Sequence, residues 1–359
     1  MQQKEDFKKS TLTWLVARLG GSFSLKILGL VFYFLIVNSL PKNESDLFFE
    51  ALSILSIIPT FFSLGLFYSI IKFFPLYLFK KQFNLIRLNI LVILSVLFVL
   101  WLVSYFFIHS LSVLPTLFQH TLILIDKTLS TNISNFFIQQ KSTLASPSIS
   151  LSNFYGLIWL ATLFTLFGSC FSSVLLAFKK FFEATYLDLF TQFMKLFFII
   201  SLIFLGLKTS IYFFGAIMGS ILLNLLIGAY LVFDFLSKHK IKETVLINIP
   251  NIFKNIKEQI LFGFPLYLGS VLNPLISQFD VLFIAYFLKN EPGAVTAYVV
   301  VSLFAKSITP VVLGPISSVQ LPLLVEENER KSDKFFRLAR LSANLGFYIG
   351  IIVLAFFLV

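Results

Sequence analysis

The segment LFGFPLYLGSVLNPLISQFDVLFIAYFL spans Leu261–Leu288, and a second apolar segment, Ala294–Val325, follows it after the short hairpin KNEPG. Each segment is long enough to cross the hydrocarbon core of a bilayer, which takes about 20 apolar residues in a helix. The first segment contains Asp280 and the second contains Lys306. An ionisable side chain at membrane depth costs roughly 3 kcal/mol or more, so each is expected to face a partner or a pathway.

A polar stripe also runs along the first segment. It is formed, at spacings of three, four and three residues, by Ser270, Asn273, Ser277 and Asp280. These spacings place the four side chains on one side of an α-helix. A polar stripe on a membrane helix is expected to face another helix or a wet cavity rather than lipid.

The composition is that of a polytopic membrane protein. Hydrophobic residues make up 58% of the 359 residues and charged residues only 13%, against about 25% charged residues in soluble domains. The single cysteine, Cys170, lies in an apolar block, which excludes a disulfide framework and a thiolate metal site. The net charge of +11 comes from loops where the positive-inside rule places cations, so no nucleic acid partner is expected.

Nine membrane-spanning segments can be drawn from the apolar blocks. With the N-terminus in the cytoplasm, most Lys and Arg residues fall in cytoplasmic segments or at the span ends beside them, as the positive-inside rule requires. We therefore expect an all-α, multi-pass protein of the cytoplasmic membrane. The nine expected spans are Leu12–Leu40, Leu47–Phe79, Ile86–Ile108, Phe154–Phe178, Ala184–Leu207, Ile211–Leu236, Leu261–Leu288, Ala294–Val325 and Phe336–Val359.

The spans are expected to form two lobes. Residues 1–236 make a complete first lobe of six spans, and residues 261–359 make a partial second lobe of three spans. Residues 237–260 are expected to be a cytoplasmic amphipathic linker, because an apolar residue recurs in it every four positions. These residues are Ile252, Ile256 and Ile260. Outside, the apolar segment Leu117–Leu129 is too short to span and is expected to lie in the interface.

The two lobes show signs of an internal repeat. An offset of 247 residues places Lys42-Asn43-Glu44 on Lys289-Asn290-Glu291, and Pro75-Leu76 on Pro322-Leu323. Both copies consist of a span, a short outside hairpin, a long span with a late proline and a basic inside segment. Many membrane transporters are built from two such related halves, and we interpret the match in this way.

Basic residues lie inside several expected spans. Four-residue spacings place Arg18, Ser22 and Lys26 on one side of the first span. Arg18 lies near the cytoplasmic end, so it either snorkels to the headgroups or faces a cavity. Lys26 lies near mid-span and is expected to face a cavity. Lys72, near the inner end of the second span, has the same two interpretations as Arg18.

The balance of charge inside the spans is positive. One face of the fifth span carries Asp188, Gln192 and Lys195. An ion pair between Asp188 and Lys195 is possible but stretched, because the two residues are two helical turns apart. Asp280 is the one deep acid, and its depth allows a pair with Lys306. The remaining surplus of bases predicts a cavity that attracts an anion, such as a phosphate or pyrophosphate on an apolar tail.

Motifs of enzymes are absent from the sequence. The three histidines are scattered, and no HExxH, GxSxG or Walker sequence occurs. We therefore expect neither an enzyme nor a metal or cofactor site.

At this point the sequence resembles a known family. The second-lobe segment opens with a G-x-P motif at Gly263 and Pro265, and its apolar helix contains one acid, Asp280. The hairpin that follows contains Gly293, and the next span ends with Pro322 before an acidic end that begins at Glu326. The segment Phe62–Leu66 followed by Lys72 is similar to the family's first-lobe motif, although Ser63 replaces an acid. The hairpin Leu40-Pro41-Lys42 also departs from the family's Leu-Gly-Pro. This pattern resembles the oligosaccharide flippases of the multidrug/oligosaccharidyl-lipid/polysaccharide superfamily.

The resemblance implies a MATE-like architecture, with two six-helix lobes facing each other across a cavity. Alternating access would carry a polyisoprenyl-(pyro)phosphate-linked oligosaccharide across the membrane for cell-surface polysaccharide biosynthesis. The phosphate would be bound by Arg18, Lys26, Lys72, Lys195 and Lys306. A gate or a coupling site for H⁺ or Na⁺ would be formed by Asp280, Asn273 and Ser277. The family has twelve or fourteen spans, so we expect the nine-span chain to come from a truncated reading frame.

Three alternatives remain at this stage. A multidrug or cation exporter of the same superfamily would need acids in its cavity, against the bases of the first span. A membrane polymerase of glycan assembly would need catalytic residues outside, where the one long loop offers Asp126 as its only acid. A non-transporting scaffold is favoured only if the nine-span form is the whole product.

Overall fold

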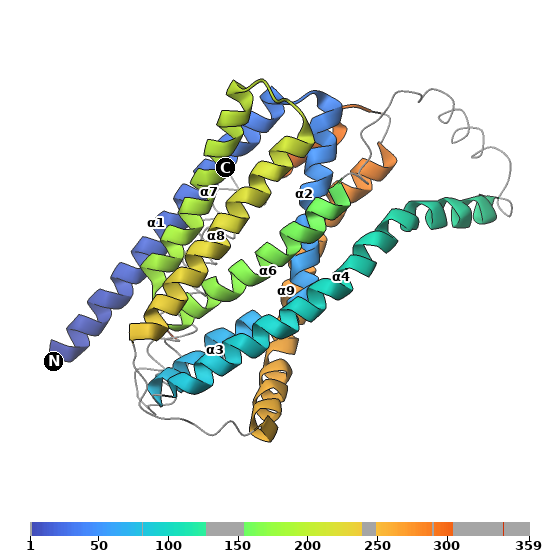
Figure 1. Ribbon diagram of the computed structural model, residues 1–359. Helices are drawn as coiled ribbons and strands as arrows, with labels where there is room; N and C mark the ends of the chain where they lie inside the picture. Colours follow the sequence, from blue (N-terminus) through green and yellow to red (C-terminus); the bar gives the residue numbers. More distant parts are fainter. Residues whose placement is uncertain are drawn as a thin grey trace.

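The protein is a bundle of long helices (Figure 1). The computed structural model describes residues 2–80, 82–126, 154–238, 249–288, 291–303 and 340, with side chains left undescribed at 2–19, 107–126, 249–256 and 273. No strand occurs in these ranges. The helices are α1 (Gln2–Ser39), α2 (Lys42–Phe62), α3 (Leu66–Phe79), α4 (Phe83–Asp126), α6 (Tyr155–Ala177), α7 (Phe181–Phe204), α8 (Ser210–Lys238), α9 (Ile249–Phe287) and the short helix Ala294–Leu303.

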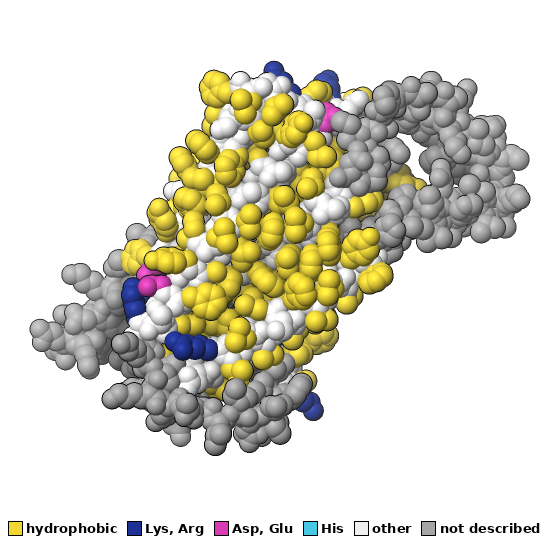
Figure 2. All heavy atoms as spheres, in the orientation of Figure 1, with side chains coloured by type: hydrophobic (Ala, Val, Ile, Leu, Met, Phe, Trp, Pro, Cys, Tyr) yellow, Lys and Arg dark blue, Asp and Glu magenta, His cyan; other side chains and the backbone are white. Residues whose placement is uncertain are grey.

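Seven helices in the described ranges are long and apolar enough to cross a membrane. They coincide with the first to seventh expected spans, and they confirm an all-α, multi-pass membrane protein. Figure 2 shows hydrophobic side chains over the middle of the visible face and charged side chains near its two ends. Large apolar side chains point outward from several helices, among them Phe204, which is 87% exposed, and Ile276, which is 75% exposed. Such a surface is stable against lipid tails rather than water.

The expected span Leu47–Phe79 is wrong as a single helix. The chain breaks between α2 and α3, where Leu64 (φ 45°) and Gly65 (φ 74°) adopt left-handed backbone conformations. One unbroken helix from α2 to the end of α3 would be about 57 Å long, nearly twice the hydrocarbon thickness. Leu64 is an unusual residue in this conformation, and Gly65 is the usual one.

Two helices are longer than the expected spans within them. α4 continues past the predicted end at Ile108 to Asp126, so the apolar segment that begins at Leu117 extends the same helix instead of standing apart. α9 begins at Ile249 and joins the predicted amphipathic helix to the seventh span without interruption. Pro250 lies in the first turn of α9, where a missing backbone N–H costs little. The eighth span is described only as far as Leu303, and the ninth lies outside the described residues except for Arg340.

The buried core is organised around α6. This helix packs against α8, α3, α4 and α2, and it places Ile158, Leu166, Val174 and Ala177 in fully buried positions. α1 packs on α7, while α9 packs on α2 and α3 (Figure 1). The predicted first lobe is therefore held by α6, and the chain beyond residue 249 is attached to it mainly through α2 and α3.

A close helix crossing joins the α2–α3 break to α9. A Cβ atom on Gly263 would lie 2.5 Å from the Gly65 carbonyl oxygen and 2.7 Å from Ser69 Oγ. Ser69 Oγ donates to the Gln259 carbonyl (2.5 Å), and Tyr267 OH donates to the Phe61 carbonyl (2.7 Å). Small residues at such crossings let backbones approach and are the usual means of helix association in membranes.

Replacing Gly263 by alanine is expected to lower the free energy of unfolding by about 1–3 kcal/mol, because the new methyl group has no room against the Gly65 backbone. The matched control is Gly269→Ala on the same helix, where nothing lies within 4 Å of the new Cβ and stability should be unchanged or raised. Thermal unfolding of both variants in detergent measures the difference. Equal midpoints for the two variants would contradict the crossing.

Candidate functional site

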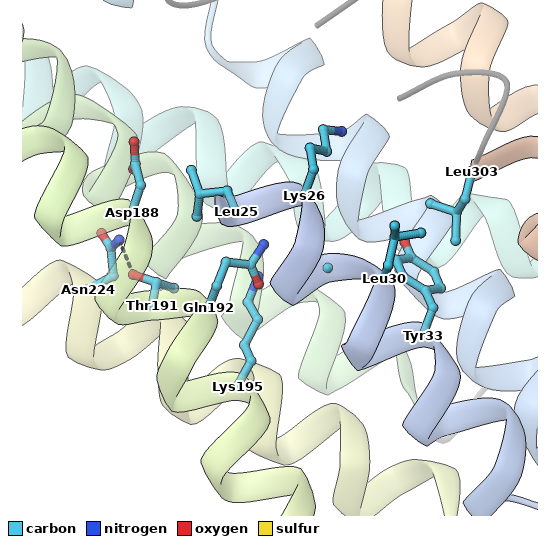
Figure 3. Close-up of a pocket in the computed structure, with 11 residues that line it drawn as sticks. Leu25, Lys26, Leu30, Tyr33, Asp188, Thr191, Gln192, Lys195, Asn224 and Leu303 are labelled. Atoms are coloured by element: carbon cyan, nitrogen blue, oxygen red, sulfur yellow. Dashed lines mark hydrogen bonds between the residues drawn. The ribbon is translucent and has the colours of Figure 1, made fainter. Parts of the chain in front are cut away.

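A cavity of about 460 Å³ lies between α1, α7 and α8, and Leu303 closes part of it from the Ala294–Leu303 helix (Figure 3). All three helices are candidate membrane spans, so the cavity lies within the membrane-spanning part of the bundle. Its lining mixes aliphatic, hydroxyl, amide and charged side chains. The lining residues are Leu25, Lys26, Gly29, Leu30, Tyr33, Asp188, Thr191, Gln192, Lys195, Asn224 and Leu303.

Two of the basic residues predicted from the sequence meet at this cavity. Lys26 comes from α1 and Lys195 from α7, and Lys195 extends toward Gln192 (Figure 3). Among the side chains that the structure describes, no carboxylate forms an ion pair with either ammonium group. Because an ammonium group at membrane depth needs water or an anion nearby, the cavity gives both lysines an environment that lipid would not.

The one acid that lines the cavity, Asp188, stands apart from Lys195. Figure 3 shows its carboxylate pointing away from Lys195. The two residues are two helical turns apart on α7, about 10 Å along the axis, which explains why the stretched pair considered from the sequence does not form. The described ionisable side chains of the lining therefore carry two positive charges and one negative charge.

An amide and a hydroxyl of the cavity lining are fixed by hydrogen bonds. Thr191 Oγ1 donates to the Leu187 carbonyl (2.7 Å), so it accepts the bond that Asn224 Nδ2 donates (2.5 Å; Figure 3). Gly168 of α6 makes room for this pair, since a Cβ atom there would lie 3.1 Å from Asn224 Oδ1. The second Nδ2 hydrogen of Asn224 is left as a further donor at the cavity wall.

The comparisons with known proteins bear on this arrangement. Residues 11–327 match the model of a family described as "Polysaccharide biosynthesis protein". The chain belongs to this family. No curated protein and no solved structure matches the chain. The family match confirms the resemblance drawn from the motifs around Gly263, Asp280 and Gly293.

Of the other predicted phosphate ligands of this polysaccharide biosynthesis protein, the structure describes only the side chain of Lys72, which is not among the lining residues of this cavity. Lys72 Nζ lies 3.6 Å from the ring centroid of Phe262 and 5.1 Å from that of Phe73. This cation–π contact joins α3 to α9 and places Lys72 outside the cavity lining. Arg18 lies on α1, two turns before Lys26, with its side chain outside the described residues. Lys306 lies outside the described residues altogether.

Of the predicted gate residues, Asp280 contacts the Ala294–Leu303 helix, and neither Asp280 nor Ser277 is among the lining residues of this cavity. The Asp280 carboxylate accepts a hydrogen bond from Tyr298 OH and another from the Val281 backbone N–H (2.8 Å). Ser277 Oγ donates to the Pro274 carbonyl (3.3 Å). The Asn273 side chain is outside the described residues. The pair between Asp280 and Lys306 stays a prediction, because only one of its members is described.

Sequence reasoning missed most of the neutral side chains of the cavity and the partner of Asp280. Thr191 lies three and four residues from Asp188 and Lys195, so its place on their face could have been read from helical spacing. Asn224 stands as an isolated amide in an apolar helix, which is also a readable signal. Nothing in the sequence connects either residue to Gly168.

A Gly168→Ala substitution is expected to weaken the Asn224–Thr191 hydrogen bond, because the new methyl group requires Asn224 Oδ1 to move. The expected loss is about 1 kcal/mol in the free energy of unfolding, the usual net value of one hydrogen bond. Gly156→Ala on the same helix, with nothing within 4 Å of its Cβ, is the control. Denaturant unfolding in detergent measures both, and a loss no greater for Gly168→Ala than for the control would contradict the predicted role of Gly168.

Proposed function

We propose that this protein transports a polyisoprenyl-(pyro)phosphate-linked oligosaccharide across the cytoplasmic membrane, with the phosphate group held in the cavity between α1, α7 and α8. The observation that carries the proposal is the pair Lys26 and Lys195, two ammonium groups at a membrane-embedded cavity, neither of which forms an ion pair with a carboxylate in the described part of the chain. A (pyro)phosphate would supply the missing negative charge.

The remaining lining supports the same cargo. Gln192 and Asn224 can donate hydrogen bonds to phosphate or sugar oxygens. Leu25, Leu30 and Leu303 offer apolar contacts to the first isoprene units of a carrier lipid. Membership of a polysaccharide biosynthesis family agrees with a lipid-linked sugar as the cargo.

A transport role is proposed in preference to catalysis. Within the described ranges no group of three or more His, Cys, Asp or Glu residues could hold a metal ion, and the cavity has a single carboxylate. We propose that an H⁺ or Na⁺ gradient drives the cycle, with Asp280 and Ser277 as the coupling region and Tyr298 as the partner of Asp280.

The test measures movement of a fluorescent polyisoprenyl-pyrophosphate-linked disaccharide in proteoliposomes. The double variant Lys26→Gln/Lys195→Gln is expected to slow transport at least about tenfold, because each lost charge-assisted contact to phosphate is worth about 1.5–3 kcal/mol. Lys208→Gln, which removes an exposed cation outside the cavity, should leave the rate unchanged.

Two outcomes would contradict the proposal. One is equal transport by the double variant and the Lys208→Gln control at matched protein levels. The other is transport of a lipophilic cationic dye that is lost on Asp188→Asn and kept in the double variant, which would favour the cation exporter.

A further inference from the structure

The first two turns of α2 carry two carboxylates, Glu44 and Asp46, that bind the starts of two other helices. Glu44 accepts hydrogen bonds from the Ser210 backbone N–H (2.8 Å) and from Ser210 Oγ, at the start of α8. Asp46 accepts bonds from the Gly293 N–H (2.7 Å), the Thr296 N–H (2.8 Å) and Thr296 Oγ1 (2.6 Å), at the start of the Ala294–Leu303 helix.

Both contacts are energetically favourable for the same reason. The first N–H groups of a helix have no partner within the helix, and the helix dipole makes that end positive. A carboxylate supplied by another helix satisfies these donors with charge-assisted hydrogen bonds. Each of the two carboxylates therefore binds a helix end that would otherwise need water or a cap of its own.

The two contacts differ in what they connect. α2 and α8 both belong to the predicted first lobe, so Glu44 stabilises one lobe internally. The Ala294–Leu303 helix belongs to the predicted second lobe, so Asp46 joins the two lobes. Ser45 adds to the junction, because its Oγ lies 2.8 Å from Thr296 Oγ1. Gly293 has φ +92°, and a Cβ atom built on it would lie 3.3 Å from Lys42 Cδ.

The internal repeat locates this junction in the molecule. Asp46 and Gly293 are 247 residues apart, which is the offset that aligns the two Lys-Asn-Glu hairpins. A residue that contacts its own counterpart in a two-fold arrangement lies on the two-fold axis. Because a repeat of six spans returns the chain to the same side, this axis runs along the membrane normal. The contact therefore lies at one end of the axis between the lobes.

We propose that Asp46 is a latch that closes the predicted outer mouth of the transport pathway between the lobes. In this structure the latch is closed, and opening toward the outside requires Asp46 to release Gly293 and Thr296. The inference rests on the proposed transport function and on the six-span repeat. Hydrogen bonds suit a contact that must break, because water replaces them when the mouth opens and the net loss is only about 1.5–3 kcal/mol for each bond to the carboxylate.

Thiol labelling without substrate tests the latch directly. Ser45 is 2% exposed, so a Ser45→Cys reporter should be protected from a membrane-impermeant maleimide while the mouth is closed. Adding Asp46→Ala is expected to raise the labelling rate about tenfold, since the closed state loses charge-assisted hydrogen bonds. Adding Glu44→Ala instead should leave the rate within about twofold, because that carboxylate binds within one lobe. Cys170 is buried, and the parent protein without the reporter gives its background.

The result that overturns the latch is an equal labelling rate for the two variants, whether both rise or neither does. A second measurement leaves Asp46 intact and keeps the proposal testable if Asp46→Ala does not fold. In the Ser45→Cys/Thr296→Cys variant, the replaced oxygens lie 2.8 Å apart, so oxidation should link the lobes and stop transport of the fluorescent disaccharide probe, with recovery on reduction. A linked protein that still transports the probe would also overturn the latch.

The two proposals can fail separately. If the parent protein does not transport the probe, the labelling comparison still tests whether Asp46 holds the mouth closed. If transport depends on Lys26 and Lys195 while Asp46→Ala labels like the control, the proposed function stands and the latch does not.

Discussion

The cost of placing a charge inside a hydrocarbon slab governs the polar parts of this molecule. Four ionisable side chains in the described spans meet this cost in recognisable ways. Lys72 places its ammonium group over the ring of Phe262, and Asp280 accepts a hydrogen bond from the hydroxyl group of Tyr298. Lys26 and Lys195 line a cavity. Only the last arrangement leaves charge for a ligand, because the other two are satisfied by the protein itself.

The same cost shapes the backbone at the break between α2 and α3. A helix end in the membrane exposes polar groups that lipid cannot satisfy. Here the Ser63 N–H donates to the Thr60 carbonyl and the Leu66 N–H to the Ser63 carbonyl, so the turn satisfies its own groups. The neighbouring helix α9 then approaches closely enough for Tyr267 to donate to Phe61. The break thus creates the surface on which α9 packs.

The type and approximate position of the first seven expected spans could be predicted from the sequence, because apolar length alone decides whether a segment enters a bilayer. Which of the basic residues share a cavity could not be predicted from the sequence. Lys26, Lys72 and Lys195 look alike in sequence, and only the packing of α1 on α7 and of α3 on α9 separates ligand candidates from a structural cation. The expected span that proved to be two helices contains Gly65, the residue at the break. A membrane helix tolerates glycine, so this residue alone did not predict a break. The cap provided by Asp46 was also beyond sequence reasoning, since it joins residues 247 positions apart.

Two junctions connect α2 and α3 to the chain beyond residue 249. They differ in the interactions that are lost when the two sides separate. At Gly65 and Gly263 the backbones touch without room for a methyl group, so parting them forfeits close packing that neither lipid nor water restores. At Asp46 the contact consists of hydrogen bonds to Gly293 and Thr296, all of which water can replace. In the proposed transport cycle, a rigid-body movement of one predicted lobe against the other would therefore cost least if it pivoted about the glycine crossing and opened at the carboxylate. In that cycle the difference between a packed contact and a contact that water can replace would select the end that opens.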